Sequence, residues 1–342
     1  MKPPLTQAKT LLGGRAGVLA GSALAAGATA LWVQRRARKA ERDHPPVGRF
    51  VEVGGVRLHY IERGEGPPVV LLPGNAVLVQ DFLANGLIDR LSERYRVIAF
   101  DRPGFGFSER PRDRLWTAKA QAALLHEAFA ALGIERPVVL GHSWGTLVAL
   151  GLALEHPADV QGLVLVSGYY YPTARLDVPM TAPAALPVLG DVMRYTVTPL
   201  LGRLSLGGLA KAMFAPVPVP PQFFETLPRE MMVRPGQIRA NAEDAVFMIP
   251  AAAGFRKRYG QLSMPVRLLA GAEDKIVDPQ AHSMRLQQEL PASRLTVVPG
   301  AGHMVHYAVP ELVVAAVDAV AGSAGSAAKQ VPLLLKAHPA AA

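Results

Sequence analysis

Cysteine is absent from this chain of 342 residues. The absence excludes a thiol nucleophile, a disulfide framework and a metal site with cysteine ligands, although it does not identify the compartment. Hydrophobic residues make up 50% of the chain, so it can bury the core of one large α/β domain, or of one domain that carries an insertion. The composition therefore predicts a globular protein without thiol chemistry.

The body of the chain has almost no net charge. The formal net charge is +9, but residues 1–44 alone carry a net +6 from eight basic and two acidic side chains. Lys329 and Lys336, near the C-terminus, supply two further positive charges, and the remaining body is almost neutral. Because a nucleic-acid interface needs a basic stripe on the folded domain, we expect no nucleic-acid partner.

The N-terminal stretch AGVLAGSALAAGATALWV, residues 16–33, has no charge and is about long enough to cross a bilayer. Five basic side chains directly after it outnumber the three before it, which predicts that the following domain lies on the cytoplasmic side. We interpret residues 1–48 as a membrane anchor and a basic linker. Two alternatives stay open: export after cleavage of a signal peptide at the small residues 28–30, or a soluble appendage.

Short β-like runs alternate with longer helical stretches from Arg49 onward, which is typical of an α/β fold with a mainly parallel sheet covered on both faces. The first two runs, 49–53 and 56–62, are split by two glycines and predict a hairpin. Six further apolar runs lie at residues 67–73, 95–100, 137–141, 161–167, 264–271 and 293–300. We expect helices at about 78–93, 117–133, 144–156, 279–290 and 310–321.

One interval breaks the alternation. Residues 169–263 are far longer than a crossover helix needs, so we expect an inserted cap between core segments 49–168 and 264–321. The cap holds six of the ten methionines together with several phenylalanines, which suits either an apolar substrate or the packing of the cap itself. Residues 322–342 are of low complexity and predict a flexible tail.

The segment VVLGHSWGTL, residues 138–147, places Ser143 between a strand-like run and an apolar helical run. On a sharp turn from strand to helix, the residues two before and two after the serine crowd each other, and both positions favour glycine. Gly141 and Gly145 occupy these positions. Catalysis by a serine hydroxyl also requires a base, an orienting carboxylate and donors for the developing oxyanion. Ser143 is our candidate nucleophile.

With this nucleophile elbow, the chain resembles the α/β-hydrolase superfamily over roughly residues 49–321. The segment FDRPGFGFSERP, residues 100–111, is similar to the glycine-rich turn that this superfamily carries after its fourth strand. The resemblance implies an α/β-hydrolase fold with a mainly parallel eight-stranded sheet and an inserted helical cap. It also implies a hydrolase that uses no cofactor and no metal.

The family places its acid and its histidine on the loops after the last two strands. Asp274 stands where the acid stands, with Glu273 and Asp278 as near alternatives. Some members carry the acid one strand earlier, but this chain has SGYYYP there and no carboxylate. His303 matches the family's catalytic histidine, and His306, one helical turn on, is expected to be structural.

The resemblance assigns the oxyanion hole to the backbone N–H groups of Trp144 and Asn75. The family's usual His-Gly before the second donor is Pro73-Gly74 here. Proline has no N–H, but Asn75 keeps the donating position, so the hole can form while the orienting role of the missing histidine side chain needs a substitute. We expect His142, beside the nucleophile, to be structural or to line the pocket.

These residues predict a serine hydrolase that cleaves carboxylic esters of apolar substrates through an acyl-enzyme intermediate. The same triad could instead hydrolyse C–C, amide or lactone bonds, transfer acyl groups or form peroxyacids without a cofactor, and a non-catalytic binding protein on this scaffold is a third reading. Relatives that open epoxides or displace halide use an aspartate nucleophile. Ser143 argues against both reactions, although the RPGFGFS segment and the apolar cap give an epoxide-hydrolase-like pattern.

Overall fold

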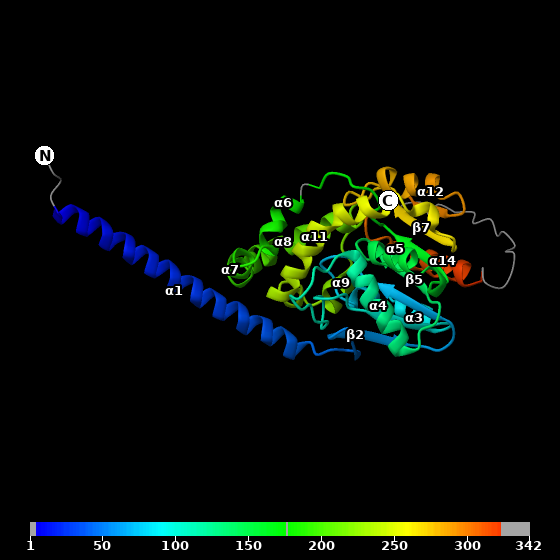
Figure 1. Ribbon diagram of the computed structural model, residues 1–342, viewed down its shortest axis with the longest axis horizontal. Coiled ribbons are helices and arrows are strands. Elements are labelled where there is room, and N and C mark those ends of the chain that lie inside the picture. Colours follow the sequence, from blue (N-terminus) through cyan, green and yellow to red (C-terminus); the bar gives the residue numbers. More distant parts are fainter. Residues whose placement is uncertain (1–4, 176, 323–342) are drawn as a thin grey trace, which may run out of the picture.

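A single sheet of eight strands forms the centre of the computed structural model, which describes residues 5–175 and 177–322 (Figure 1). The strands are β1 (Arg49–Val53), β2 (Val56–Arg63), β3 (Pro68–Leu72), β4 (Arg96–Phe100), β5 (Val138–His142), β6 (Gly162–Val166), β7 (Val266–Gly271) and β8 (Arg294–Val298). Their order is β1-β2-β4-β3-β5-β6-β7-β8. The first two strands form an antiparallel hairpin, β2 is antiparallel to β4, and all other neighbours are parallel. The predicted sheet is confirmed, with one strand at each apolar run.

Helices cover both faces of the sheet, as the sequence predicted. One face is packed by α4 (Ala118–Leu132), α5 (Gly145–Glu155) and α12 (Arg285–Glu289), and the other by α2 (Gln80–Ala84), α3 (Leu87–Ser92) and α14 (Pro310–Gly322). Because β5 and β6 are buried on both sides, their sequences are continuous apolar runs without alternation.

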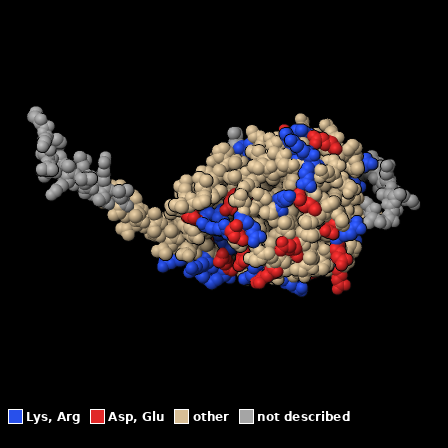
Figure 2. Space-filling model, viewed as in Figure 1, with Lys and Arg blue, Asp and Glu red and all other residues tan. Residues whose placement is uncertain are grey.

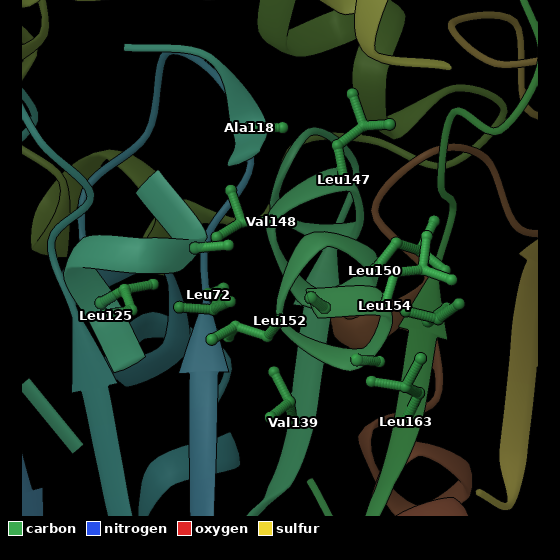
Figure 3. Packing of buried hydrophobic residues seen from close by; sticks show 14 of the residues in the cluster. Leu72, Ala118, Leu125, Val139, Leu147, Val148, Leu150, Leu152, Leu154 and Leu163 are labelled. Atoms are coloured by element: carbon green, nitrogen blue, oxygen red, sulfur yellow. The ribbon is translucent and has the colours of Figure 1, made fainter. Parts of the chain in front are cut away.

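Helix α5 lies directly behind the turn that carries Ser143. Its leucines and valines pack between the strands and α4, as Figure 3 shows for Leu147, Val148 and Leu152. A Cβ atom added at Gly151 would lie 3.0 Å from the Cβ of Ala122, so this glycine allows the two helices to approach closely. A helix buried on all sides gives the turn before it a rigid support.

Helices also make up the predicted insertion between β6 and β7. They are α6 (Asp177–Thr181), α7 (Leu189–Tyr195), α8 (Val197–Phe214), α9 (Pro221–Thr226), α10 (Arg229–Met232) and α11 (Pro235–Phe255). Met213, Phe214 and Phe223 are buried in one apolar cluster with Val77 and Met304 of the core. Much of the apolar content of the cap therefore serves its own packing and its attachment to the core.

The N-terminal segment forms one long helix, α1 (Leu5–Asp43), which projects from the globular body (Figure 1). Its C-terminal part packs on the cap: Val33 and Ala40 are buried, and Glu41 pairs with Arg234 at 2.7 Å. The predicted bilayer span over residues 16–33 is not supported, since no helix among the described residues is long and apolar enough to cross a membrane. Alanine and glycine dominate this stretch, and they contribute little hydrophobicity. The predicted tail, from residue 323 on, lies outside the described residues.

A buried histidine holds the chain where it leaves the sheet for the cap. The Nδ1 atom of His282 accepts hydrogen bonds from the backbone N–H groups of Tyr170 and Tyr171, at 3.0 and 3.3 Å. Nδ1 is therefore unprotonated, and the proton resides on Nε2, which lies 3.1 Å from Thr173 Oγ1. Burial lowers the pKa of His282 to about 4, with the nearby Arg175 and Arg285 acting in the same direction and Asp278 and Asp274 against it.

We expect His282 to make the protein sensitive to acid. Between pH 6.5 and about 4 this imidazole is protonated in the unfolded chain but neutral in the folded one, so the free energy of unfolding falls as the pH drops through that window. The full shift corresponds to about 3 kcal/mol. His282→Asn keeps an acceptor for the tyrosine N–H groups but cannot titrate, so urea unfolding across this window should show a shallower pH dependence. Equal slopes for both proteins would contradict the assignment.

Candidate active site

The turn between β5 and α5 holds Ser143 in a strained conformation. Its φ is 51°, in the left-handed region, and its backbone N–H donates to Val166 O at 2.8 Å. A Cβ at Gly141 would lie 2.7 Å from the carbonyl of Gly145, and a Cβ at Gly145 would lie 2.2 Å from Leu72 O. Both glycines are therefore required by contact with backbone atoms, and the turn presents the serine side chain at the carboxyl edge of the sheet.

The loops after β7 and β8 bring a carboxylate and an imidazole to this serine. His303 Nε2 lies 2.9 Å from Ser143 Oγ, and His303 Nδ1 lies 2.8 Å from Asp274 Oδ2. The side chains of His303 and Asp274 are almost completely buried, while Ser143 is partly accessible. Three side chains that are distant in sequence thus form one continuous hydrogen-bonded chain.

Asp274 is held in place by its second carboxylate oxygen. Oδ1 accepts hydrogen bonds from the backbone N–H groups of Ile276 and Val277, at 2.8 and 2.9 Å, which leaves Oδ2 for His303. The neighbouring carboxylates Glu273 and Asp278 are exposed. The structure therefore brings Asp274, and neither of the two alternatives, to the imidazole.

The cap contacts the histidine loop directly. The backbone N–H of His303 donates to Met213 O, near the end of α8, at 3.0 Å. A Cβ at Gly302 would lie 1.9 Å from Ala215 O, so the loop and the end of this helix are in close contact. A displacement of α8 would therefore shift the imidazole relative to Ser143.

Two backbone amides beside Ser143 are available as donors. Among the described residues, the N–H groups of Asn75 and Trp144 have no hydrogen-bond acceptor. Trp144 precedes the first residue of α5, so the positive end of the helix dipole is at this position. A Cβ at Gly74 would lie 3.1 Å from the Cβ of Ser143, which places the loop after β3 against the nucleophile. Such a pair of amides can stabilise an oxyanion.

Arg102, which no sequence motif singled out, orients the loop after β3. Its Nε donates to Pro73 O and its Nη2 to Gly74 O, both at 2.8 Å. The guanidinium also lies over the Trp144 ring, 4.5 Å from its centroid. Arg102 thereby connects both amide donors, and it provides the orienting contact that the loop lacks without a histidine side chain.

Asp244 on α11 balances the charge of this buried arginine. Its carboxylate contacts Arg102 Nη1 at 2.5 Å, Arg110 Nη2 at 3.0 Å and Gln121 Nε2 at 3.1 Å. The backbone carbonyl of Asp244 accepts from the indole N–H of Trp144 at 2.9 Å. Burial lowers the pKa of Arg102, and the nearby Asp244 carboxylate opposes this effect. The cap therefore supplies the counter-ion of the residue that positions the loop.

A second group of histidines lies behind the triad. His142 Nε2 contacts His303 O at 3.3 Å, and His306 Nε2 contacts Asp81 Oδ2 at 2.8 Å. Burial, followed by the neighbouring imidazoles of His306 and His303, holds the pKa of His142 well below its usual range. His142 is thus a buried neutral group behind the histidine loop, and His306 is held by its contact with Asp81.

Among the residues that the structure describes, two clusters bring three potential metal ligands within 4.8 Å of one another: Asp81, His142 and His306 in the interior, and His126, His156 and Asp159 nearer the surface. In the interior cluster, a direct hydrogen bond already joins His306 to Asp81. In the surface cluster, His126 Nε2 contacts Asp159 Oδ2 at 2.9 Å. In each cluster, one imidazole is thus already in hydrogen-bond contact with the carboxylate.

Comparison with known proteins gives consistent similarities. The sequence model for the alpha/beta hydrolase fold matches residues 67–308. The chain is 26% identical over 288 residues to haloalkane dehalogenase 2 of Mycobacterium tuberculosis, with 80% of this chain and 94% of the relative covered. It is 30% identical over 270 residues to the 2-hydroxymuconate semialdehyde hydrolase of Pseudomonas putida, with 77% and 90% covered. The structure of a thermophilic esterase from Thermogutta terrifontis superposes with a TM-score of 0.67 at 23% identity, covering 82% of this chain and all of that one.

Proposed function

The chain belongs to the α/β-hydrolase fold family and is a hydrolase, and we propose that it cleaves carboxylic esters with Ser143 as nucleophile, His303 as base and Asp274 as orienting acid. The observation that carries this proposal is the continuous hydrogen-bonded chain from Ser143 Oγ through His303 to Asp274, with distances of 2.9 and 2.8 Å. A serine on a strained elbow with a base in contact is the arrangement that activates a weak alcohol nucleophile.

The proposed reaction proceeds in two halves. Ser143 Oγ attacks the ester carbonyl while His303 Nε2 takes the hydroxyl proton, and Asp274 stabilises the resulting imidazolium through Nδ1–H. The amides of Asn75 and Trp144 stabilise the tetrahedral oxyanion. His303 then gives the proton to the leaving alkoxide. A water molecule attacks the acyl-enzyme in the same way and releases the acid, so the cycle needs no cofactor.

The relatives differ in the reactions that their names state, and Ser143 helps to choose between them. Halide displacement in this family uses an aspartate nucleophile, whereas the elbow here carries a serine. The nucleophile thus argues against a haloalkane substrate for this chain. The Pseudomonas relative is named as a hydrolase of 2-hydroxymuconate semialdehyde, which keeps carbon–carbon bond hydrolysis open as a second activity.

An apolar ester is the substrate class we favour, because the side chains that neighbour the histidine loop are apolar. Met304 follows His303, and its side chain is buried with that of Met213 in the apolar cluster where the cap meets the core. These side chains pack against one another, so they favour an uncharged substrate by keeping the surroundings of His303 apolar.

A panel of substrates tests the function. We expect p-nitrophenyl esters to be hydrolysed with kcat/KM rising from acetate to medium acyl chains, and a fluorophosphonate probe to label Ser143. Amides, lactones and 2-hydroxymuconate semialdehyde belong in the same panel as competing substrates. A preference for short, charged acyl groups would contradict the apolar substrate, and a folded protein that neither reacts with the probe nor turns over any member of the panel would be a binding protein instead.

We further propose that the N-terminal helix associates with a membrane. Leu24, Leu31 and Trp32 are exposed on α1 and precede segment 35–42, in which five of the eight residues are basic. Basic and apolar side chains together bind anionic lipid surfaces without crossing them. Fractionation of cells that express the full chain tests this association, and recovery of all protein apart from membranes would contradict it.

A further inference from the structure

A cavity of about 400 Å³ lies where α1 meets the cap and the loop that follows β4. None of the three proposed catalytic residues, Ser143, Asp274 and His303, lines this cavity. Six arginines and a single acidic residue contribute to its walls: Arg38, Arg110, Arg112, Arg194, Arg234, Arg239 and Glu41. Figure 2 shows Lys and Arg side chains gathered at this end of the molecule, where α1 joins the globular body.

The acidic partners of these arginines are shared, so positive charge is left over. Arg112 and Arg194 both pair with Asp191. Glu243 forms ion pairs with both Arg110, at 2.6 Å, and Arg239, at 3.4 Å.

The remaining two acids do not neutralise the cavity either. Asp244, the second partner of Arg110, is also the counter-ion of Arg102. Glu41 pairs with Arg234, and Arg38 has no acidic partner within the described part of the chain. Guanidinium groups therefore outnumber the carboxylates around the cavity.

Two nitrogen donors in the cavity wall, Arg194 Nε and Gln237 Nε2, are buried without an acceptor among the described residues. Arg239 Nε lies 3.4 Å from Glu243 Oε1 but not in hydrogen-bond geometry. Arg194 is 4% exposed and Gln237 is 1% exposed, so bulk water cannot readily supply the missing acceptors. Burial lowers the pKa of Arg194 and of Arg239, and the positive charge of Arg112 acts in the same direction on both. A buried donor without an acceptor is destabilising, and so is a cluster of like charges.

We propose that this cavity is a binding site for a phosphate group, separate from the active site. A phosphomonoester supplies up to about two negative charges and several acceptor oxygens, which match the excess guanidinium charge and the unpaired donors. The planar forks of arginine bind phosphate oxygens in pairs. The phosphate can belong to a soluble phosphorylated compound or to the headgroup of a lipid, since α1 and the cap both frame the cavity.

Titration calorimetry of the full chain with inorganic phosphate and with pyrophosphate, at constant ionic strength, tests the site. Arg239→Gln removes one guanidinium from the cavity wall, and we expect it to weaken binding about tenfold or more, because hydrogen bonds to charged groups are strong. Arg38→Gln changes an exposed side chain, so it preserves folding, and it should weaken binding as well. Arg256→Gln is the matched control, since Arg256 is an exposed arginine at the opposite end of α11.

Thermal unfolding separates a ligand site from a purely structural arginine cluster. Without phosphate, Arg239→Gln should change the unfolding temperature little, because the relief of repulsion from Arg112 and Arg110 offsets the loss of its contacts with Glu243 and the carbonyl of Arg110. With phosphate, the wild type and Arg256→Gln should gain stability that Arg239→Gln does not gain. Equal stabilisation of all three proteins would reflect a general salt effect and would overturn the proposal.

Vesicle sedimentation distinguishes the two sources of phosphate. If the site takes a lipid headgroup, phosphatidylcholine vesicles that contain phosphatidic acid should bind Arg256→Gln more tightly than Arg239→Gln. If it takes a soluble phosphate, the two variants should bind these vesicles equally, while calorimetry still separates them. No difference between the variants in either assay would overturn the proposal. These outcomes are independent of ester hydrolysis, so they do not depend on the proposed reaction.

Discussion

Replacing Ser143 with alanine should lower the turnover of the best ester substrate on the order of 10⁴-fold or more. The substitution removes the proposed attacking oxygen, whereas the amides of Asn75 and Trp144, the proposed oxyanion donors, stay in place. The Oγ atom contacts His303 Nε2, so its loss leaves the imidazole and Asp274 paired with each other. Steady-state kinetics of the variant, with thermal unfolding as a check on folding, measures this effect.

Ser205→Ala is a matched control for this change. Ser205 is exposed on α8 and its hydroxyl donates to Gly202 O at 3.2 Å, so its removal should leave turnover within about twofold, as is usual for surface substitutions. A Ser143→Ala variant that retains more than a tenth of the wild-type turnover would exclude Ser143 as the nucleophile. Loss of labelling by a fluorophosphonate in the same variant would identify the reactive hydroxyl independently.

The parts of the fold that depend on local sequence could be predicted. A strand buried on both faces is a continuous apolar run, so β5 could be recognised from a short stretch of sequence. The sharp turn at Ser143 brings backbone atoms into contact and requires glycine, so the positions of Gly141 and Gly145 could be recognised in the same way. The local sequence pattern was less accurate about breaks within a helical stretch. The helix expected over residues 78–93 is two helices, α2 and α3, because Gly86 has a φ of 72° and interrupts the helix.

The contacts that orient the site could not be predicted, because they join residues far apart in the chain. Asp244 lies 142 residues after Arg102, on a helix that the sequence placed only within a general cap. Nothing in the RPGFG segment indicates that Arg102 turns inward to the carbonyls of the loop after β3. The apolar residues of the cap were ambiguous for a related reason: whether a methionine faces a substrate or a neighbouring helix depends on packing, which the composition does not determine.

Replacing Asp244 with alanine should lower the free energy of unfolding by about 3–5 kcal/mol, which is the usual effect of leaving a buried charge unpaired. Arg102 is fully buried, and Asp244 is its acidic partner in the structure, so the guanidinium would keep its charge without a counter-ion. Urea unfolding measures the loss. Hydrolysis should also slow at temperatures where the variant is folded, mainly in kcat, because Arg102 would be drawn away from the carbonyls of Pro73 and Gly74.

A double-mutant cycle separates the buried pair from a general weakening of the cap. Arg102→Met should cost less in the Asp244→Ala background than in the wild type, because it removes the charge that the first change leaves unpaired. Asp113→Ala is the surface control: Asp113 pairs with its exposed neighbour Arg114, so its loss should leave the free energy of unfolding nearly unchanged. If the Arg102 and Asp244 substitutions were simply additive, the two side chains would act independently, and the cap would not hold the loop through this pair.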